Sequence, residues 1–120
     1  MPKCILSVDD DPVVLGLIQH TLQGHGYEVI TAQDGKMALE ILQNKIPDLI
    51  LLDVQMPNMN GYTFISEKLH VPSLAKVPIV VISSLKETMP LFKRHGVKAY
   101  LLKPLNIQAL LETVQAILPE

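Results

Sequence analysis

The chain has 120 residues, of which 48 % are hydrophobic and 4 % aromatic, and its formal net charge is −2 at pH 7. This length predicts a single domain over residues 1–120 with an aliphatic core. A charge so close to neutral gives no support for a nucleic-acid-binding surface, and no apolar stretch is long enough to span a bilayer. Because no signal peptide is evident, we expect a soluble cytoplasmic protein with no nucleic-acid or membrane partner.

The first apolar run, residues 3–8, predicts a strand that is buried on both faces and stops at three consecutive aspartates. Asp11 can cap a following helix, and Pro12 suits its first turn. We expect this helix to end near Gly24. Its apolar residues recur at spacings of three and four, which predicts one apolar face made of Val14, Leu17, Ile18 and Leu22.

Residues 27–32 predict a second strand, and a turn at Asp34 and Gly35 precedes a second helix. In this helix, the positions that we expect to face inward are Ala38, Leu39, Ile41 and Leu42.

Four aliphatic residues, 49–52, then predict a central strand that runs directly into Asp53. A carboxylate at the mouth of a buried strand is costly unless a cation or hydrogen-bond donors meet it. The sequence therefore marks Asp53 as a candidate functional residue.

The middle of the chain predicts a third helix over residues 62–69 and a connecting loop over residues 71–77. Residues 78–82 predict a fourth buried strand that ends at Ser83. Residues 85–95 predict only a short or distorted helix, because Pro90 removes a helix hydrogen bond.

The C-terminal part predicts a fifth strand over residues 99–102, which stops at Lys103 and Pro104. Asn106 can cap a last helix with a clear helical period. Its apolar positions are Ile107, Leu110, Leu111, Val114, Ile117 and Leu118.

Strand and helix alternate five times, which predicts an α/β fold with helices on both faces of a parallel sheet. The strand order 2-1-3-4-5 of flavodoxin-like (βα)5 three-layer sandwiches fits such a chain. In this order, the carboxyl ends of strands 1, 3, 4 and 5 lie next to one another. The polar residues at these ends are Asp9, Asp10, Asp53, Ser83 and Lys103.

Three carboxylates gathered at one edge would repel one another unless a hard cation such as Mg²⁺ lay between them. The backbone carbonyl of Gln55, two residues beyond Asp53, could add a neutral ligand. Lys103 supplies a positive charge and Ser83 a small hydroxyl. This set suits the stabilisation of a phosphoryl group in transit to a carboxylate, with Asp53 as the nucleophile.

These residues resemble the receiver domain of bacterial two-component response regulators, and the similarity spans essentially the whole chain. Each matching piece is weak alone, whereas all of them in order at the expected strand ends are specific. The pieces are Val8-Asp9-Asp10, Leu52-Asp53 through Met56-Pro57 and Gly61, Pro78-Ile79 through Ser83, and Tyr100 through Lys103-Pro104.

The resemblance implies that Asp53 accepts phosphate from a histidine kinase or a histidine phosphotransfer protein. It implies that Asp10 binds Mg²⁺ directly and that Asp9 helps through water, with Mn²⁺ as an alternative metal. The chain would then be a signalling domain that catalyses only its own phosphorylation and dephosphorylation. The resemblance further implies a cis peptide bond between Lys103 and Pro104, which would aim Lys103 at the site.

By the same resemblance, Ser83 and Tyr100 form a switch pair. Phosphorylation would draw the Ser83 hydroxyl and Lys103 inward, and Tyr100 would rotate into the space released. The face formed by helix 4, strand 5 and helix 5 would change for an output domain, a downstream protein or a second copy. The interval from Ser83 to Tyr100 is shorter than usual in the family and contains Pro90. We therefore expect an altered helix there and a non-standard partner or dimer mode.

Three other functions are compatible with parts of this pattern. A haloacid-dehalogenase-like phosphatase would use the Asp-x-Asp of residues 9–11 with Ser83 and Lys103, but a later acidic pair and a cap domain are missing. A flavodoxin-like carrier would need a Ser-, Thr- and Gly-rich phosphate loop where three aspartates stand. A degenerate receiver that only binds partners would not need the full set of acidic, hydroxyl and lysine positions.

Overall fold

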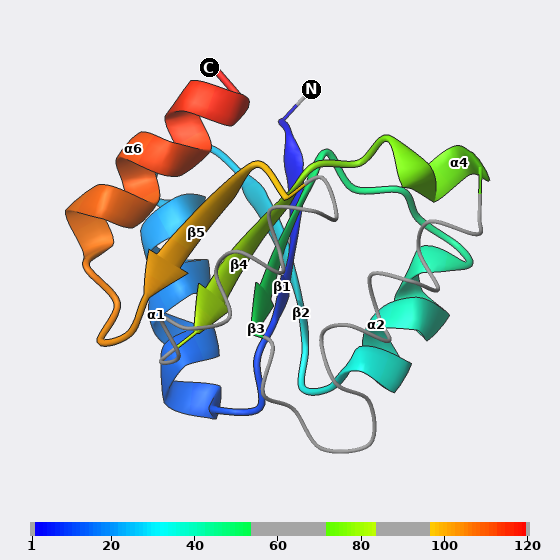
Figure 1. Cartoon of the computed structure of the whole chain (residues 1–120), viewed down its shortest axis with the longest axis horizontal. Coiled ribbons are helices and arrows are strands. Elements are labelled where there is room, and N and C mark those ends of the chain that lie inside the picture. The colour runs from blue at the N-terminus through cyan, green and yellow to red at the C-terminus, as the bar shows by residue number, and fades with distance from the viewer. Residues whose placement is uncertain (1, 54–71, 84–96, 120) are drawn as a thin grey trace.

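Five parallel strands form one sheet in the order β2-β1-β3-β4-β5 (Figure 1). This computed structural model describes residues 2–53, 72–83 and 97–119. The predicted parallel sheet and its strand order are confirmed. The strands are β1 (Cys4–Val8), β2 (Glu28–Ala32), β3 (Leu49–Asp53), β4 (Ile79–Ser83) and β5 (Ala99–Leu102).

The three central strands are the most apolar, and every residue of β1, β3 and β4 is buried. Strands that are covered on both faces read as continuous aliphatic runs, because neither face meets water. The outer strands β2 and β5 are only partly buried. The contrast explains why the central strands were the clearest elements in the sequence.

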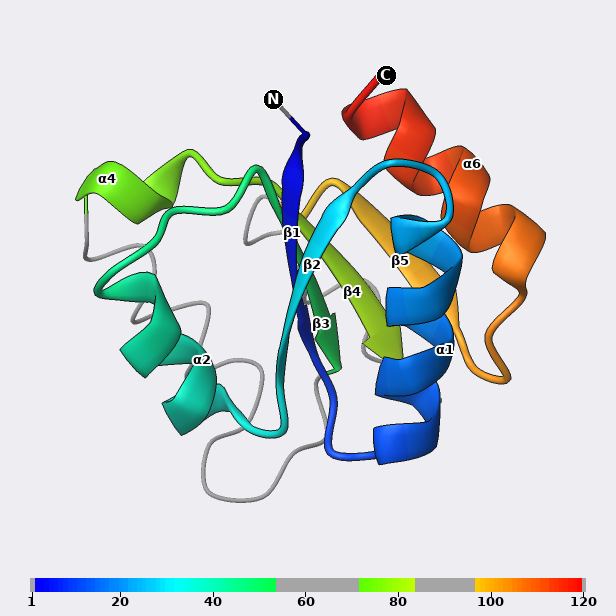
Figure 2. The same ribbon diagram turned by 180° about the vertical axis from the view of Figure 1, so that it is seen from behind.

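Helices cover both faces of the sheet and complete the predicted three-layer sandwich (Figures 1 and 2). The helices α1 (Pro12–Gln23) and α6 (Ile107–Ile117) cover one face, where Ile18, Leu22, Leu110 and Val114 belong to one buried cluster. The helices α2 (Gly35–Leu42) and α4 (Pro72–Ala75) cover the other face. In the described ranges, no helix is both long and apolar enough to cross a bilayer.

The apolar face expected for α1 was partly wrong. Leu17 is 44 % exposed, whereas Leu15, which the prediction omitted, is 5 % exposed. At 3.6 residues per turn, positions 15, 18 and 22 share one side of a helix and position 17 lies on the opposite side. Val13 and Val14 are apolar as well, so the spacing alone did not decide which side packs against the sheet.

The loop expected over residues 71–77 was also wrong, because residues 72–75 form the single helical turn α4. Proline is common in the first turn of helices, and here Pro72 opens the turn. A further turn follows α4 and is closed by a hydrogen bond from the Val77 N–H to the Leu74 carbonyl at 3.1 Å. Leu74 is buried, so packing against the sheet stabilises a turn too short to show a helical period.

Three helices begin with a side-chain cap of the same type. The carboxylate of Asp11 accepts a hydrogen bond from the Val13 N–H, and that of Asp34 from the Met37 N–H. In the same way, Asn106 accepts from the Ala109 N–H at 3.0 Å. The caps predicted at Asp11 and Asn106 are confirmed, and α2 begins directly at Gly35, where the sequence predicted a turn.

Two predicted elements lie outside the described residues, namely the helix over 62–69 and the altered helix over 85–95 with Pro90.

Candidate functional site

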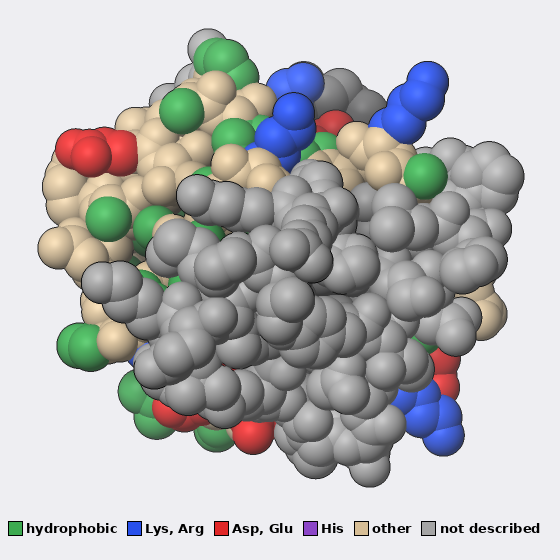
Figure 3. Space-filling view, in the orientation of Figure 1, with side chains coloured by type: hydrophobic (Ala, Val, Ile, Leu, Met, Phe, Trp, Pro, Cys, Tyr) green, Lys and Arg blue, Asp and Glu red, His purple; other side chains and the backbone are tan. Residues whose placement is uncertain are grey.

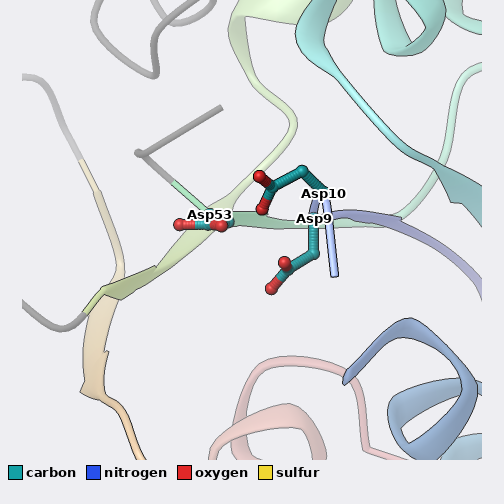
Figure 4. Close-up of side chains that lie close together, drawn as sticks. All are labelled: Asp9, Asp10 and Asp53. Atoms are coloured by element: carbon teal, nitrogen blue, oxygen red, sulfur yellow. The ribbon is translucent and has the colours of Figure 1, made fainter. Parts of the chain in front are cut away.

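Three aspartates gather at the carboxyl ends of β1 and β3. Asp9 and Asp10 follow β1 directly, and Asp53 is the last residue of β3. The two strands are paired in register, with Val8 opposite Leu52. The three side chains therefore converge, and one oxygen from each carboxylate lies within 4.8 Å of the others (Figure 4). Asp9 and Asp53 are almost fully buried, whereas Asp10 is exposed.

The backbone on both sides of Asp9 holds this residue in place. Its own N–H donates to the Ala32 carbonyl at 3.1 Å, which extends the pairing of β1 with β2 by one residue. Its Oδ1 accepts a hydrogen bond from the Asp11 N–H at 2.9 Å. Its Oδ2 is buried without a hydrogen bond in the part of the chain that the structure describes, and it faces the Lys103 ammonium. One oxygen of Asp9 is thus tied to the backbone, and the other pairs with the Lys103 ammonium.

Lys103 places the positive charge among these carboxylates. Its Nζ lies 3.2 Å from Asp9 Oδ2 and 3.4 Å from Asp53 Oδ2. Its backbone N–H donates to the Ser83 carbonyl at 2.9 Å, which continues the pairing of β4 with β5. The peptide bond between Lys103 and Pro104 is cis, as the resemblance implied.

Burial lowers the pKa of Lys103, but the carboxylates of Asp53 and Asp9 together raise it by more, so the net pKa lies above its ordinary value of 10.5. Lys103 is therefore a fixed ammonium at neutral pH. It offsets part of the repulsion among the three carboxylates and part of the cost of burying two of them, Asp9 and Asp53.

Ser83 and Tyr100 lie on the neighbouring strands β4 and β5. Ser83 is completely buried at the end of β4, opposite Leu102 of β5. Tyr100 pairs with Val81 and is partly buried against the cluster that underlies α2 and α4. Gln55, the expected carbonyl ligand, lies outside the described residues.

The residues present fit a hard divalent cation. Three carboxylates and one ammonium leave a formal charge of −2, which one divalent ion would balance. Carboxylate oxygens are the ligands that Mg²⁺ prefers in proteins. The buried Asp9 Oδ2 has no hydrogen bond within the described ranges apart from its ion pair with Lys103, so a donor such as a metal-bound water would compensate for its burial.

Exposed lysines gather at the opposite edge of the sheet, where the strands begin. Exposed lysines precede three of the strands, namely Lys3 before β1, Lys76 before β4 and Lys98 before β5. Figure 3 shows basic side chains along the upper edge, where the strands begin, and acidic side chains at the lower edge, although some side chains of each sign lie at both edges. Because the lysines lie at the far edge, they do not neutralise the aspartate cluster.

The sequence predicted the cluster itself but missed one contact, the hydrogen bond from the backbone of Asp11 to Asp9. An aspartate often accepts a hydrogen bond from the N–H two residues further along the chain. The Asp-x-Asp spacing of residues 9–11 was therefore a readable signal. The same spacing also fits a helix cap at Asp11 and a phosphatase motif, and neither interpretation predicts this hydrogen bond.

A parallel α/β sheet with an aspartate cluster and a lysine at its carboxyl edge defines the receiver class of signalling domains. Residues 5–115 match the model of the response regulator receiver domain. The chain therefore belongs to this family, whose members are signalling domains of two-component systems and not conventional enzymes.

Relatives of known name and structure agree with this assignment. The chain is 30 % identical over 116 residues to the protein PilH of Pseudomonas aeruginosa, with 95 % of this chain and 96 % of PilH covered. It is similar in structure to the chemotaxis response regulator CheY4 of Vibrio cholerae, with a TM-score of 0.91, 34 % identity, and 98 % and 100 % coverage. A third relative is the receiver domain of a sensor histidine kinase from P. aeruginosa, solved with magnesium in its active-site cleft. It has a TM-score of 0.88 and 27 % identity, and both chains are fully covered.

Proposed function

We propose that Asp53 is a phosphoacceptor, which takes a phosphoryl group from a phosphohistidine of a histidine kinase or a histidine phosphotransfer protein. The observation that carries this proposal is the buried carboxylate of Asp53, which lies beside two further aspartates and the Lys103 ammonium. Membership of the receiver family supports the proposed donors, because receiver domains act with such proteins.

In the proposed step, an Asp53 oxygen attacks phosphorus while the P–N bond of the phosphohistidine breaks. The imidazole leaves with the electron pair of that bond, and Asp53 becomes an acyl phosphate. Lys103 pairs with a transferring phosphoryl oxygen, and the Ser83 hydroxyl donates a hydrogen bond to another. Burial of Asp53 strengthens these interactions, since water screens them less there.

The proposed metal is Mg²⁺, held by Asp9, Asp10, Asp53 and the backbone carbonyl of Gln55, with Mn²⁺ as a substitute. When bound, it would supply positive charge that offsets the charge on the phosphoryl oxygens. Asp10 suits direct ligation, because it is exposed and its oxygen lies within the cluster. Asp9 suits a water-mediated contact, because its Oδ1 is engaged by the backbone and its Oδ2 faces Lys103. The magnesium in the related histidine-kinase receiver supports this choice.

The proposed output is a change in the face that contains β5 and α6. Ser83 and Lys103 are joined through the backbone at 2.9 Å, and Tyr100 lies on the same strand pair. A shift of the Ser83 hydroxyl toward a phosphoryl group would open space that Tyr100 can enter. A partner that prefers the new face, whether an output domain, a separate protein or a second copy, would then be favoured.

A protein donor would approach the carboxyl edge of the sheet, and α1 presents apolar surface beside that edge. Val13 is 77 % exposed and Leu17 is 44 % exposed. The helix α1 begins at Pro12, directly after the run of aspartates at residues 9–11. Exposed apolar residues next to a polar site are typical of protein contact surfaces. We propose that this side of α1 contacts the phosphohistidine protein.

The proposal is tested by incubation with Mg²⁺ and radiolabelled acetyl phosphate, followed by separation under denaturing conditions. Unmodified protein should take up base-labile, acid-stable phosphate only when the metal is present, and Asp53→Asn should take up none. A variant such as Glu112→Gln, on the exposed side of α6, should behave as the unmodified protein.

The same experiment separates the remaining alternatives. Continuous hydrolysis of phosphate esters would point to the phosphatase and contradict the proposal. Folded protein that takes up no phosphate at any Mg²⁺ concentration would point to a receiver that only binds partners.

A further inference from the structure

We propose that Asp11 is a positioning residue for the metal site, in addition to the helix cap that it provides. This inference rests on the proposed function, because it assigns to Asp11 a role in holding Asp9 for the cation. Asp11 is not expected to touch the metal or the phosphoryl group. Its role follows from two hydrogen bonds that share one residue.

The first bond fixes the conformation of Asp11. Its carboxylate Oδ1 accepts from the Val13 N–H at 2.9 Å, and its backbone is extended, with φ −92° and ψ 110°. The carbonyl of Asp11 also accepts from the Leu15 N–H at 3.0 Å, which is the first bond of the helix. Asp11 is thereby attached to α1 through both its side chain and its carbonyl.

The second hydrogen bond joins Asp11 to Asp9 in the proposed metal site. The Asp11 N–H donates to Asp9 Oδ1 at 2.9 Å, and Asp9 is buried. With Oδ1 held, the other oxygen of Asp9 is directed toward Lys103 and the cluster. The cap of α1 therefore orients a carboxylate on which the cation site depends. Such supporting contacts set metal affinity even though they are not ligands.

Pro12 contributes to the same geometry. A residue that precedes proline is restricted to extended conformations, so part of the Asp11 backbone geometry survives loss of the side chain. The expected effect of removing the carboxylate is for this reason moderate. It should be larger when Pro12 is replaced together with Asp11.

The chain offers a matched set of variants. Asp11→Asn keeps a side-chain oxygen that can cap the helix but removes the charge, whereas Asp11→Ala removes both. Asn106→Ala removes a side-chain cap from α6, where the side chain accepts from the Ala109 N–H, three residues further on, at 3.0 Å. Its cost in stability should be similar, yet α6 makes no such bond to the aspartate cluster within the described chain.

The experiment measures Mg²⁺ dissociation constants by calorimetry for each variant, and the amide proton shift of residue 11 in metal-free protein by NMR. We expect Asp11→Ala to weaken Mg²⁺ binding by about threefold to tenfold, and Asp11→Ala with Pro12→Ala by about tenfold or more. Asp11→Asn and Asn106→Ala should stay within about twofold of the unmodified protein. The amide of residue 11 should move upfield in the two variants that carry Asp11→Ala, as its hydrogen bond to Asp9 weakens, and should not do so in Asp11→Asn or Asn106→Ala.

The outcomes separate this inference from the proposed function. If the unmodified protein binds no Mg²⁺, the proposed function fails, whereas an upfield shift in Asp11→Ala would still support the positioning of Asp9. If the unmodified protein binds Mg²⁺ and Asp11→Ala binds it equally well, the inference is overturned. Equal weakening in Asp11→Asn and Asp11→Ala would overturn it too, because charge and not the cap would then be responsible.

Discussion

At the scale of single residues, Lys103 connects three strands of the sheet. Its ammonium contacts Asp9 after β1 and Asp53 at the end of β3, and its N–H donates to Ser83 at the end of β4. The Lys103 side chain is only 24 % exposed, so its ion pairs are less screened than surface pairs. Removing the ammonium would leave two buried carboxylates without their compensating charge.

We expect Lys103→Met to destabilise the metal-free protein by about 1–2 kcal/mol at neutral pH. Because the pKa of Lys103 is raised in the folded state, its contribution is fully present below pH 10.5, the ordinary pKa, and is lost as the pH rises through the higher folded-state pKa. Urea unfolding at a series of pH values in a metal chelator tests this. The difference between the two proteins should be constant from pH 7 to about pH 10 and should shrink above it.

Lys98→Met provides the control, because Lys98 is exposed and has no ion pair within the described residues. Its stability should match that of the unmodified protein at every pH. A difference for Lys103→Met that persists unchanged at strongly alkaline pH would show that lost packing, and not lost charge, causes the destabilisation.

At the scale of elements, one hydrogen bond ties the last helix to the connection between α1 and β2. The Tyr27 hydroxyl donates to the Leu118 carbonyl at 2.9 Å, across 91 positions of sequence. Tyr27 is buried, and Leu118 directly follows the last residue of α6. The carbonyls at the end of a helix lack partners within the helix, so the hydroxyl satisfies one of them.

Replacing Tyr27 by Phe keeps the ring and removes this bond. We expect a loss of about 1–2 kcal/mol in the free energy of unfolding, because the Leu118 carbonyl would stay buried without this donor. Amide exchange should locate the effect. The Leu118 N–H, which donates to Val114 at 2.7 Å, should exchange faster, whereas amides of α2 should be affected only by the overall change in stability. Equal acceleration in both helices would contradict a local role for Tyr27.

The elements also show which features of the fold could be predicted from the sequence. The five strands and their order followed from short aliphatic runs, because strands covered on both faces need them. The gathering of Asp9, Asp10 and Asp53 followed in turn, since parallel strands bring their carboxyl ends to one edge. These predictions needed only the identity of each residue and the topology.

Other features depended on information that the sequence pattern does not contain. Which side of α1 packs inward was undetermined, because Val13 and Leu17 are as apolar as Leu15. The helical turn α4 is too short to show a period. The support of Asp9 by Asp11 involves a backbone N–H, which every residue except proline carries and which residue type alone does not reveal.

At the scale of the whole molecule, an aspartate cluster lies at one end of the sheet and exposed lysines lie at the other, and different helices cover the two faces. The aspartates lie at the carboxyl edge and the exposed lysines at the amino edge (Figure 3). Beside the acidic edge, α1 exposes Val13 and Leu17, whereas the exposed Ile46 lies between α2 and β3, where β3 begins. A large partner and a small phosphodonor would thus meet different parts of the molecule.

We expect the double variant Val13→Ser with Leu17→Ser to slow phosphotransfer from a phosphohistidine protein about tenfold, because apolar contact area with that protein is lost. Uptake from acetyl phosphate should change by less than about twofold, since a small donor needs only the aspartate cluster and Lys103. Parallel time courses with both donors test this, and Ile46→Ser serves as a surface control that should leave both rates unchanged. Equal slowing with both donors would show that the variant disturbs the aspartate cluster itself.

The pairing of β4 with β5 continues to Lys103, whose main chain is held by Ser83 while its ammonium reaches the aspartates. The main chain of Lys103 is thus fixed by β4, whereas its ammonium contacts residues at the ends of β1 and β3. If the charge around the aspartates changes, the flexible methylene chain of Lys103 can adjust while its main chain stays paired with β4. Crystal structures with and without a bound phosphoryl analogue would then differ mainly in side chains and connections, and little in the strands.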